Sequence, residues 1–298
     1  MTTIPGTLDT TSTIVVGDLL PGTRVVLRDE TRYPSGSHKE PAAHAVIAAA
    51  LAAGHDRVVV GSCGNYGKAM AAAAAAADLT CTVVLPLDWN DGGEFIEAAG
   101  ADVRFVPGGY EDAVDAARLF AQETGAADGN VDGPYQEAVL DGHGSVVDSL
   151  HGALAGAHAA LWLPIGNGTT AVALHRRLRE LRWTVPLHGV GSPGNNPIVT
   201  SWPGAYRVLP SDGVVTTEHN EPLVNWHALH GPEALAAIAD TGGAVHGAHD
   251  DQLVVARAAL ERYGVQASAS GAAGLAGLLQ HARSAPVSGD QVVLVTGR

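Results

Sequence analysis

Short runs of apolar, largely β-branched residues alternate with longer alanine-rich stretches along most of the chain. Runs such as TRVVLRD and CTVVLP are apolar at nearly every inner position, which is typical of strands buried on both faces of a parallel sheet. The alanine-rich stretches favour helices because alanine has the highest helix propensity. The pattern predicts strands at 23–29, 57–61, 81–86, 102–107, 160–164, 185–191, 243–248 and 292–297. It predicts helices at 38–53, 65–77, 91–99, 110–124, 142–158, 169–182, 226–239, 249–262 and 270–283.

Strands that alternate with helices indicate βαβ crossovers, so the expected fold class is α/β with open, doubly wound parallel sheets. A chain of 298 residues has room for one large or two modest domains. In sheets of this kind, ligands bind beyond the carboxyl ends of the strands, where loops lead into the next helices. We therefore searched the loops that follow strands for candidate chemistry.

Composition narrows the class of protein. The formal charge of −14 argues against a broad surface for nucleic acid or anionic membrane. Two cysteines form no disulfide framework, and neither a signal peptide nor an apolar run of membrane-spanning length is recognisable. We expect a cytoplasmic protein that binds neither nucleic acid nor membrane. The densest run of positive charge is predicted to be a solvated helix face: Arg176, Arg177, Arg179 and Arg182.

The first candidate loop, PSGSHK at 34–39, contains one of the two lysines in the chain. We expect Lys39 to lie in the first turn of a helix, where the positive end of the helix dipole lowers the pKa of an amine. Such an amine can form a Schiff base with a carbonyl compound. The alternative is an ordinary exposed lysine. Lys68 falls inside a predicted helix and is the weaker Schiff-base candidate.

The second loop, GSCGNYG at 61–67, also leads from a strand into a helix. Ser62, Cys63, Gly64 and Asn65 are expected to present backbone N–H groups and small polar side chains to a carboxylate. A capped helix start without any ligand is the alternative. A nucleophilic role for Cys63 is disfavoured because the local motif contains no histidine that could act as its base.

The third loop, PIGNGTTA at 164–171, is expected to cradle a phosphate at a helix N-terminus. The pattern also fits the G-x-G-x-x-A motif of dinucleotide-binding folds, which expects an acidic residue after the next strand. That strand ends in GVGSPGNN, which contains no acid, so phosphate without ribose is favoured. The alternative is a plain tight turn that binds no ligand. The proposed cradle consists of Gly166, Asn167, Gly168, Thr169 and Thr170.

The fourth candidate is Thr296, at the end of the strand VVLVTG. A hydroxyl there can hydrogen-bond a neutral ring nitrogen, whereas an aspartate would hold the ring nitrogen protonated. A frayed terminus is the alternative.

Taken together and in this order, the loops resemble those of the fold-type II pyridoxal 5′-phosphate (PLP) enzymes, the tryptophan synthase β family, and most closely those of threonine synthases. The lysine motif of these enzymes reads Asn-Pro-Thr-Gly-Ser-Phe-Lys-Asp-Arg, which Pro34, Gly36, Ser37 and Lys39 match. GSCGNYG is similar to Ser-Ser-Gly-Asn-His-Gly, and PIGNGTT to Pro-Val-Gly-Asn-Gly-Gly. EPLVNWHAL at 221–229, SASGAAGLAGL at 268–278 and VTG at 295–297 extend the resemblance, which spans residues 23 to 298.

The resemblance implies a role for each of these residues. Lys39 would hold the cofactor as a Schiff base and move a proton at Cα, Asn65 would bond the 3′-oxygen of the ring, and Thr296 would face the pyridine nitrogen. The loop from Gly166 to Thr170 would hold the phosphate. The substrate carboxylate would be bound by the segment from Ser62 to Asn65. The resemblance also implies a small domain at 41–142 inserted into a large PLP-binding domain at 1–40 and 143–298, with the cofactor between them, and a homodimer.

The departures from the family motif concern the substrate more than the cofactor. His38 replaces the usual Phe, and it either contacts the substrate, as a stacking or proton-shuttling group, or fills the space of that Phe. Glu40-Pro41 replaces Asp-Arg, and the sequence ends at Arg298 without the usual His-Gly-Leu-Lys-Asp tail. A dianionic phosphohomoserine would therefore meet less positive charge than in a typical threonine synthase.

We therefore expect a PLP-dependent threonine synthase-like enzyme that catalyses elimination or replacement at Cβ or Cγ of an amino acid with a leaving group. O-phosphohomoserine and related phosphorylated or acylated amino acids are the candidate substrates. The alternatives are a threonine or serine ammonia-lyase and a cysteine synthase-like β-replacement enzyme. A catalytically silent PLP-fold protein is disfavoured because Lys39 is present.

No metal site is expected. His246, His249, Asp250 and Asp251 could in principle bind a metal, but acids at a helix start are better explained by capping. His227 and His230 are three residues apart, and two histidines without a third ligand are typical of a surface.

Overall fold

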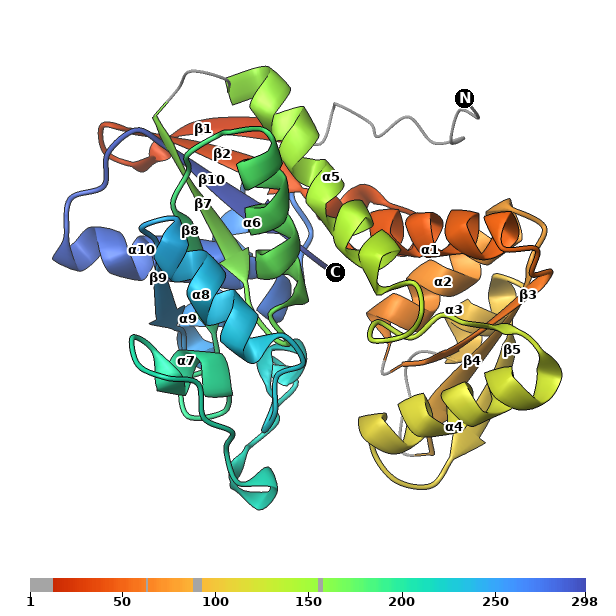
Figure 1. Ribbon diagram of the computed structural model, residues 1–298. Helices are drawn as coiled ribbons and strands as arrows, with labels where there is room; N and C mark the ends of the chain where they lie inside the picture. Colours follow the sequence, from red (N-terminus) through yellow and green to blue (C-terminus); the bar gives the residue numbers. More distant parts are fainter. Residues whose placement is uncertain (1–12, 63, 88–92, 155–157) are drawn as a thin grey trace.

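The computed structural model describes residues 13–62, 64–87, 93–154 and 158–298, and it contains two sheets (Figure 1). The larger sheet has the order β1-β2-β10-β7-β8-β9, and the smaller one has the order β5-β4-β3-β6. The strands of the larger sheet are β1 (Thr13–Leu20), β2 (Thr23–Asp29), β7 (Ala159–Pro164), β8 (Leu187–Gly191), β9 (Ala244–Gly247) and β10 (Asp290–Val295). Those of the smaller sheet are β3 (Arg57–Gly61), β4 (Thr80–Pro86), β5 (Asp102–Val106) and β6 (Ala127–Asp128). Every pairing is parallel except that of β1 with β2.

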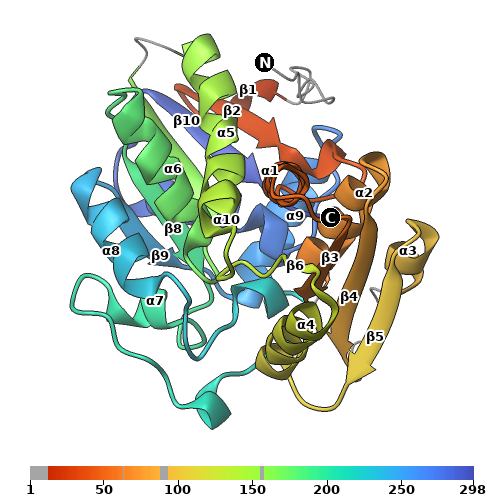
Figure 2. The ribbon, with the colours of Figure 1, turned by 45° about the vertical axis from the view of Figure 1, so that its right-hand side comes forward.

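Helices cover both faces of each sheet (Figures 1 and 2). One face of the larger sheet is covered by α5 (Gln136–Leu154), α6 (Thr169–Glu180), α7 (Pro197–Ser201) and α8 (Gly231–Asp240), and the other by α9 (Asp250–Glu261) and α10 (Ala273–Ser284). The smaller sheet lies between α4 (Tyr110–Thr124) and a layer formed by α1 (Glu40–Ala52), α2 (Asn65–Ala76) and α3 (Gly93–Ala98). Strand β7 shows why the runs are continuously apolar: Leu161 and Leu163 enter one core, while Trp162 enters the opposite one.

The predicted α/β class with doubly wound sheets is confirmed, and so is each predicted strand, with small shifts at the ends. The strands β1 and β6 and the short helix α7 were not predicted, and neither were the 3₁₀ turns. β1 is largely exposed and contains Gly17 and Asp18, so it lacks a continuous apolar run, whereas β6 and α7 are too short to show a period.

Two predicted helix starts were wrong. The helix predicted from 226 begins at Gly231 as α8, because Pro232 has no N–H to donate inside a helix but fits its first turn. The segment before it contains a 3₁₀ turn at Glu221–Leu223. The helix predicted from 142 begins earlier, at Gln136, as α5.

Helix α5 contributes to the cores on both sheets (Figure 1). Val139, near its start, packs in the core of the smaller sheet, whereas Val147 and Leu150 pack in the core of the larger sheet. Where α5 crosses α1, Gly142 lies so close that a Cβ on it would be 2.4 Å from Cα of Ala42. The predicted domain boundaries at 40/41 and 142/143 remain predictions, and the second falls inside this helix.

Replacing Gly142 with alanine is expected to destabilise the fold by about 1–3 kcal/mol, because the added methyl group must push α1 and α5 apart. Gly152 provides a matched control on the same helix, since nothing lies within 4 Å of a Cβ built there. Gly152→Ala is expected to be stabilising by about 0.5–1 kcal/mol through helix propensity. Urea unfolding of both variants measures the difference, and equal effects would show that the crossing is not tightly packed.

Candidate active site

The three strands β2, β10 and β7 are neighbours and run parallel, so their carboxyl ends lie at one edge of the larger sheet. Val295 at the end of β10 is level with Asp29 at the end of β2. The loops that follow these strands are 30–39, 165–168 and 296–298. We call residues 30–39 the lysine loop and residues 165–170, which include the first turn of the next helix, the phosphate loop. The sheet order brings these two loops and Thr296 to the same edge, with Thr296 between the other two.

The lysine loop is fastened to the end of β10. The N–H of His38 donates to the carbonyl of Thr296 at 3.0 Å, and the N–H of Arg298 donates to the carbonyl of Gly36 at 3.1 Å. Gly36 adopts a left-handed conformation with φ of 73°, which turns the chain between these bonds. The half-buried Lys39 is the N-cap of α1, one position before the predicted first turn.

Glu40, at the position of the family's aspartate, supports the loop from within. Its buried carboxylate accepts the N–H of Ser35 at 2.7 Å and lies 3.7 Å from the ring of His44. Burial by itself would raise the pKa of this carboxyl, but hydrogen bonds from His44 and Ser35 outweigh it and lower the pKa. The charge of Glu40 is thus used to hold the turn of the lysine loop.

Within the phosphate loop, Gly168 is the N-cap of the twelve-residue helix α6 and has φ of 84°. The first N–H groups of a helix have no partner inside it, so they are available to an anion. The hydroxyl of Thr169 lies 3.0 Å from Nδ1 of His230, and that of Thr170 lies 3.2 Å from Nε2 of His38. The two threonine hydroxyls of the predicted loop are therefore each hydrogen-bonded to a histidine. The bond of Thr169 with His230 was not predicted.

Asn167, the predicted middle of the cradle, supports the neighbouring segment. Its carbonyl accepts the N–H of His230 at 2.9 Å, and its side-chain oxygen accepts the N–H of Leu229 at 3.2 Å. These two bonds fix the start of α8 beneath the phosphate loop.

Asn196 ties the phosphate loop to the 3₁₀ turn at Glu221–Leu223. Its fully buried side-chain amide donates to the carbonyls of Gly166 at 3.0 Å and Leu223 at 2.8 Å. Gly166 packs against this turn so closely that a Cβ would be 2.5 Å from the carbonyl oxygen of Pro222. The GVGSPGNN segment lacks the acid of a dinucleotide site, but its last asparagine precedes a proline, which is a common helix start. That pair was the signal from which Asn196 could have been predicted.

Glu221 is the first residue of the EPLVNWHAL segment, to which the sequence assigned no role. Burial raises the pKa of its carboxyl, while the positive charge of Lys39 acts in the opposite direction. The turn on which Asn196 acts therefore brings a carboxylate within electrostatic range of the candidate Schiff-base lysine.

The loop between β3 and α2 reaches this edge from the smaller sheet. A Cβ on Gly297 would be 3.3 Å from Nδ2 of Asn65, so the Asn65 side chain lies against the end of β10. Gly64 precedes the helix with φ of 115°. The hydroxyl of the buried Ser62 accepts the N–H of Gly67 at 2.8 Å, which caps α2 from inside. Cys63 lies outside the described residues, and its predicted role stays a prediction.

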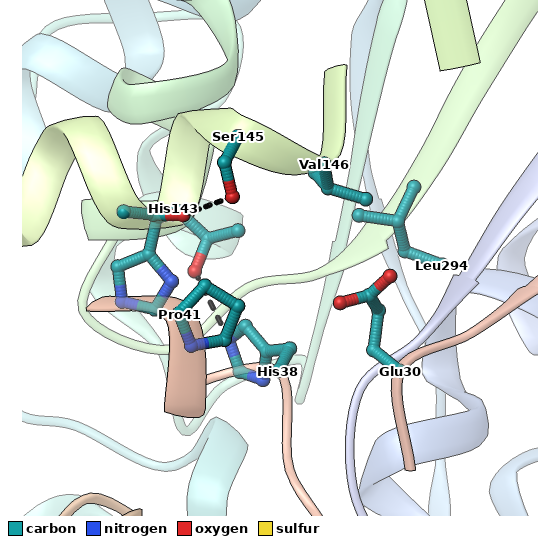
Figure 3. Close-up of a pocket in the computed structure, with 9 residues that line it drawn as sticks. Glu30, His38, Pro41, His143, Ser145, Val146 and Leu294 are labelled. Carbon is teal, nitrogen blue, oxygen red and sulfur yellow. Dashed lines mark hydrogen bonds between the residues drawn. The ribbon is translucent and has the colours of Figure 1, made fainter. Parts of the chain in front are cut away.

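His38 joins the lysine loop to both neighbouring strands' loops. Its Nδ1 lies 2.9 Å from the carbonyl oxygen of Thr296, and its ring is 5.2 Å from that of the buried His143 (Figure 3). Loss of hydration and the charge of Lys39 lower the pKa of His38 to about 4. His38 is therefore neutral at physiological pH, with both ring nitrogens in contact with site residues.

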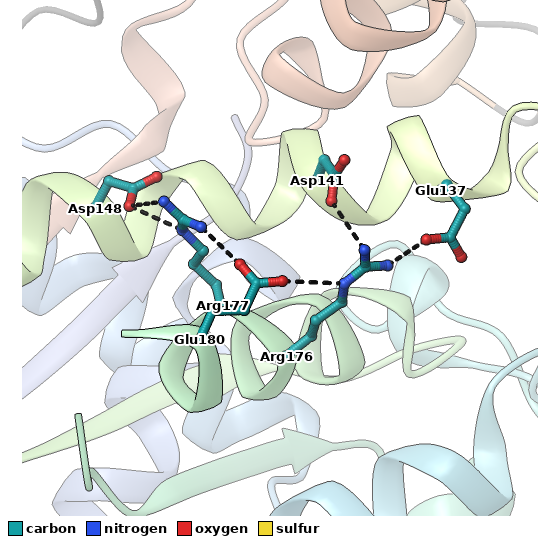
Figure 4. Close-up of polar contacts among 6 residues, drawn as sticks. All are labelled: Glu137, Asp141, Asp148, Arg176, Arg177 and Glu180. Carbon is teal, nitrogen blue, oxygen red and sulfur yellow. Dashed lines mark hydrogen bonds and ion pairs between the residues drawn. The ribbon is translucent and has the colours of Figure 1, made fainter. Parts of the chain in front are cut away.

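The arginine run forms ion pairs on the surface of α6 (Figure 4). Arg176 pairs with Glu137 of α5 and with Glu180, and Arg177 pairs with Asp148 of α5 and with the same Glu180. Exposed pairs contribute little to stability individually, but they occupy both guanidinium groups. The predicted helix face is confirmed for Arg176, Arg177 and Arg179, whereas Arg182 lies beyond the end of α6 in a left-handed turn with φ of 52°. Arg176 and Arg177 lie beside carboxylates that disfavour an added anion.

Among the described residues, no group of three or more histidine, cysteine, aspartate or glutamate side chains is arranged to hold a metal ion. Asp250 and Asp251 lie in the first turn of α9, as expected, and the N–H of the N-cap residue His249 donates to the side chain of Gln252 at 2.9 Å. The prediction for His230 was wrong: it is buried beneath Thr169, whereas His227 is exposed.

His246 belongs to a different cluster, which packs on the buried Trp162. Its Nε2 lies 3.1 Å from Nδ1 of His188, and the ring of His188 stacks on Trp162 at 4.1 Å. The ring of His281 lies 5.5 Å from that of His246. Burial and the neighbouring histidines lower the pKa values of His188 and His246 to about 4, so both are neutral and act as packing groups.

None of the helices in the described part of the chain is long and apolar enough to cross a membrane.

Comparison with known proteins agrees with this geometry. The family described as "Pyridoxal-phosphate dependent enzyme" matches residues 17–297. The threonine synthase of Methanosarcina acetivorans is 25% identical over 285 residues, which cover 91% of this chain and 68% of that protein. The structure of the serine racemase from Dictyostelium discoideum has a TM-score of 0.80 at 18% identity, covering 97% of this chain and 92% of that one. That of a fungal L-serine ammonia-lyase from Rhizomucor miehei has a TM-score of 0.78 at 21% identity, covering 96% and 93%.

Replacing Asn196 with alanine is expected to lower the unfolding free energy by about 1–3 kcal/mol, because buried carbonyls of the phosphate loop lose their donor. Amide exchange in residues 165–168 should become faster. Asn195 is the matched control, since its side chain bonds Ser192 and the N–H of Val215 and does not reach the phosphate loop. If Asn195→Ala accelerated exchange in that loop as much as Asn196→Ala, the specific tie would be disproved.

Proposed function

Since this chain belongs to the family of pyridoxal-phosphate dependent enzymes, we propose that it is a threonine synthase-like enzyme. The proposed reaction is elimination or replacement at Cβ or Cγ of an amino acid that carries a leaving group. The observation that carries the proposal is the position of Lys39, which is bonded through its own loop to the end of β10 and lies within electrostatic range of Glu221.

The residues present fit the cofactor. The loop from Gly166 to Thr170 offers helix N–H groups and hydroxyls to a phosphate, and Lys39 offers an amine on the neighbouring loop. Thr296, which lies between them, presents a neutral side chain instead of a carboxylate. Together these groups match an anion at one end of the cofactor and an aldehyde at the other.

The protein's contribution to the reaction follows from these positions. When bound, PLP supplies the delocalisation that stabilises negative charge at Cα. Lys39 would hold the cofactor, and its amine would remove or return the proton at Cα. Glu221 supplies negative charge near that amine and so favours its protonated form during the return step. The side chain of Asn65 and the loop that leads into α2 would orient the substrate.

The lysine motif differs from that of threonine synthases at the two residues after Lys39, and this difference bears on the charge of the leaving group. Where threonine synthases carry Asp-Arg, this chain has Glu40-Pro41, and the Glu40 carboxylate is folded back onto Ser35. No arginine stands there to bind a dianionic phosphate ester. This favours an amino acid with a less charged leaving group, such as an acyl ester, over phosphohomoserine.

We expect the purified protein to absorb in the near-ultraviolet to visible range, and borohydride reduction followed by peptide mapping should locate the cofactor on Lys39. Lys39→Ala should lose the absorbance band. Lys68→Ala is the matched control, because it removes the only other lysine of the sequence and should leave the band unchanged. A colourless wild-type protein that takes up no added PLP would refute the proposal.

Steady-state assays separate the proposed activity from the alternatives. With phosphohomoserine, phosphoserine, acetylserine and acetylhomoserine as substrates, we expect kcat/KM to be higher for an acyl ester than for phosphohomoserine. Release of a 2-oxo acid from serine or threonine at a higher kcat/KM than any ester would instead identify an ammonia-lyase. The likeness to the fungal L-serine ammonia-lyase shows the shared fold and does not decide between these activities.

A further inference from the structure

The two threonines of the phosphate loop are hydrogen-bonded to two histidines with opposite polarity. Nε2 of His230 lies 2.9 Å from the side-chain amide nitrogen of Gln136, which can only donate. This network assigns the ring proton of neutral His230 to Nδ1, which donates to the hydroxyl oxygen of Thr169. Thr169 therefore keeps its own hydroxyl proton for an anion.

His38 is bonded in the opposite sense. Its Nδ1 faces the carbonyl oxygen of Thr296, which can only accept, so Nδ1 carries the ring proton. In a neutral imidazole, Nε2 is then an acceptor, and the hydroxyl of Thr170 must donate to it. A hydroxyl has one proton, so Thr170 has none left to donate to a phosphate.

We propose that His38 couples the binding of an anionic phosphate at the 165–170 loop to the uptake of one proton. The proton comes from solvent and adds to Nε2, which then donates to the oxygen of Thr170. The hydroxyl of Thr170 turns its proton towards the phosphate. The inference rests on the proposed function, in which this loop holds the phosphate of the cofactor.

The surroundings explain why the proton is absent before the anion arrives. Burial removes water from the ring of His38, with the tilted ring of His143 at 5.2 Å on one side, and Lys39, its neighbour in sequence, opposes a second positive charge. Glu30 lines the same cavity of about 10 Å³ (Figure 3). Its carboxylate is already paired with Arg28. A bound dianion supplies the missing negative charge and raises the pKa of His38.

The coupling fixes the direction in which the affinity for the anion changes with pH. Without the anion, the pKa of His38 is about 4, and with the anion it is higher. Between these two values, each unit fall in pH strengthens anion binding by about tenfold, because one proton is taken up with the anion. Above the higher pKa, His38 is neutral in both the anion-free and the anion-bound protein. The affinity for the anion then no longer changes with pH through His38.

Sulfate is the suitable probe because it stays dianionic over the working range, whereas the second pKa of a phosphate group is about 6. The dissociation constant of sulfate is measured by calorimetry from pH 5 to pH 8 on the full cofactor-free chain. For the wild type it should rise by up to about tenfold per pH unit before levelling off. His38→Phe, which restores the family's residue and keeps Lys39, Glu30 and His143, should lose most of this slope. Equal slopes in the two proteins would overturn the inference.

Thr170→Val is a second variant that removes the hydroxyl and keeps His38. Its sulfate affinity should be weaker than that of the wild type at pH 6, with the slope again reduced. A full wild-type slope in this variant would also overturn the inference, because the proton would then not act through Thr170.

A spectroscopic measurement separates the inference from the proposed function. In the borohydride-reduced holoenzyme, the ring resonances of His38 should titrate at a higher pH than in the cofactor-free protein. An unchanged titration with PLP fixed on Lys39 would refute the proton coupling and leave the proposed function standing. A sulfate-linked proton uptake in a protein that never takes up PLP would support the coupling and refute the function.

Discussion

The site depends on the insertion of β10 between β2 and β7. Five residues of β10 pair with β2 and four pair with β7, so the last strand of the sheet lies between two that are distant from it in sequence. Without it, the lysine loop would have no Thr296 carbonyl to bond and the phosphate loop would be one strand further away. The geometry of the site is therefore a property of the completed sheet, which must form contacts of high sequence separation before any ligand can be held.

Features that follow from local patterns were predictable from the sequence. The buried strands showed themselves as continuous apolar runs, and the rule that ligands lie beyond carboxyl ends led to Lys39, Gly168 and Thr296 without any knowledge of strand order. The order of the strands decides which loops become neighbours, and that information came from the resemblance to a family. The stretch from 192 to 225 has no period of two or 3.6, so neither Asn196 nor Glu221 could be placed by pattern.

The unpredicted residues share a physical character. Asn196 and His230 are buried polar groups whose partners lie more than twenty residues away in sequence. Groups of this kind must be satisfied by specific hydrogen bonds, since an unpaired buried donor or acceptor costs about 1–3 kcal/mol. They make the phosphate loop rigid through bonds that no short motif encodes. His38 is the exception, because its departure from the family's Phe was visible in the sequence, while its contacts with Thr296 and Thr170 became visible only in the fold.

Helix α5 packs in the core of the larger sheet and in the core of the smaller sheet. Because one rod is embedded at Val139 in one core and at Val147 in the other, the sheets cannot slide freely past each other. Where α5 crosses α1, a Cβ on Gly142 would be 2.4 Å from Cα of Ala42, so the two helices are in close backbone contact. A displacement of one sheet relative to the other would therefore have to disturb the packing of a single helix at both of its ends or at this crossing.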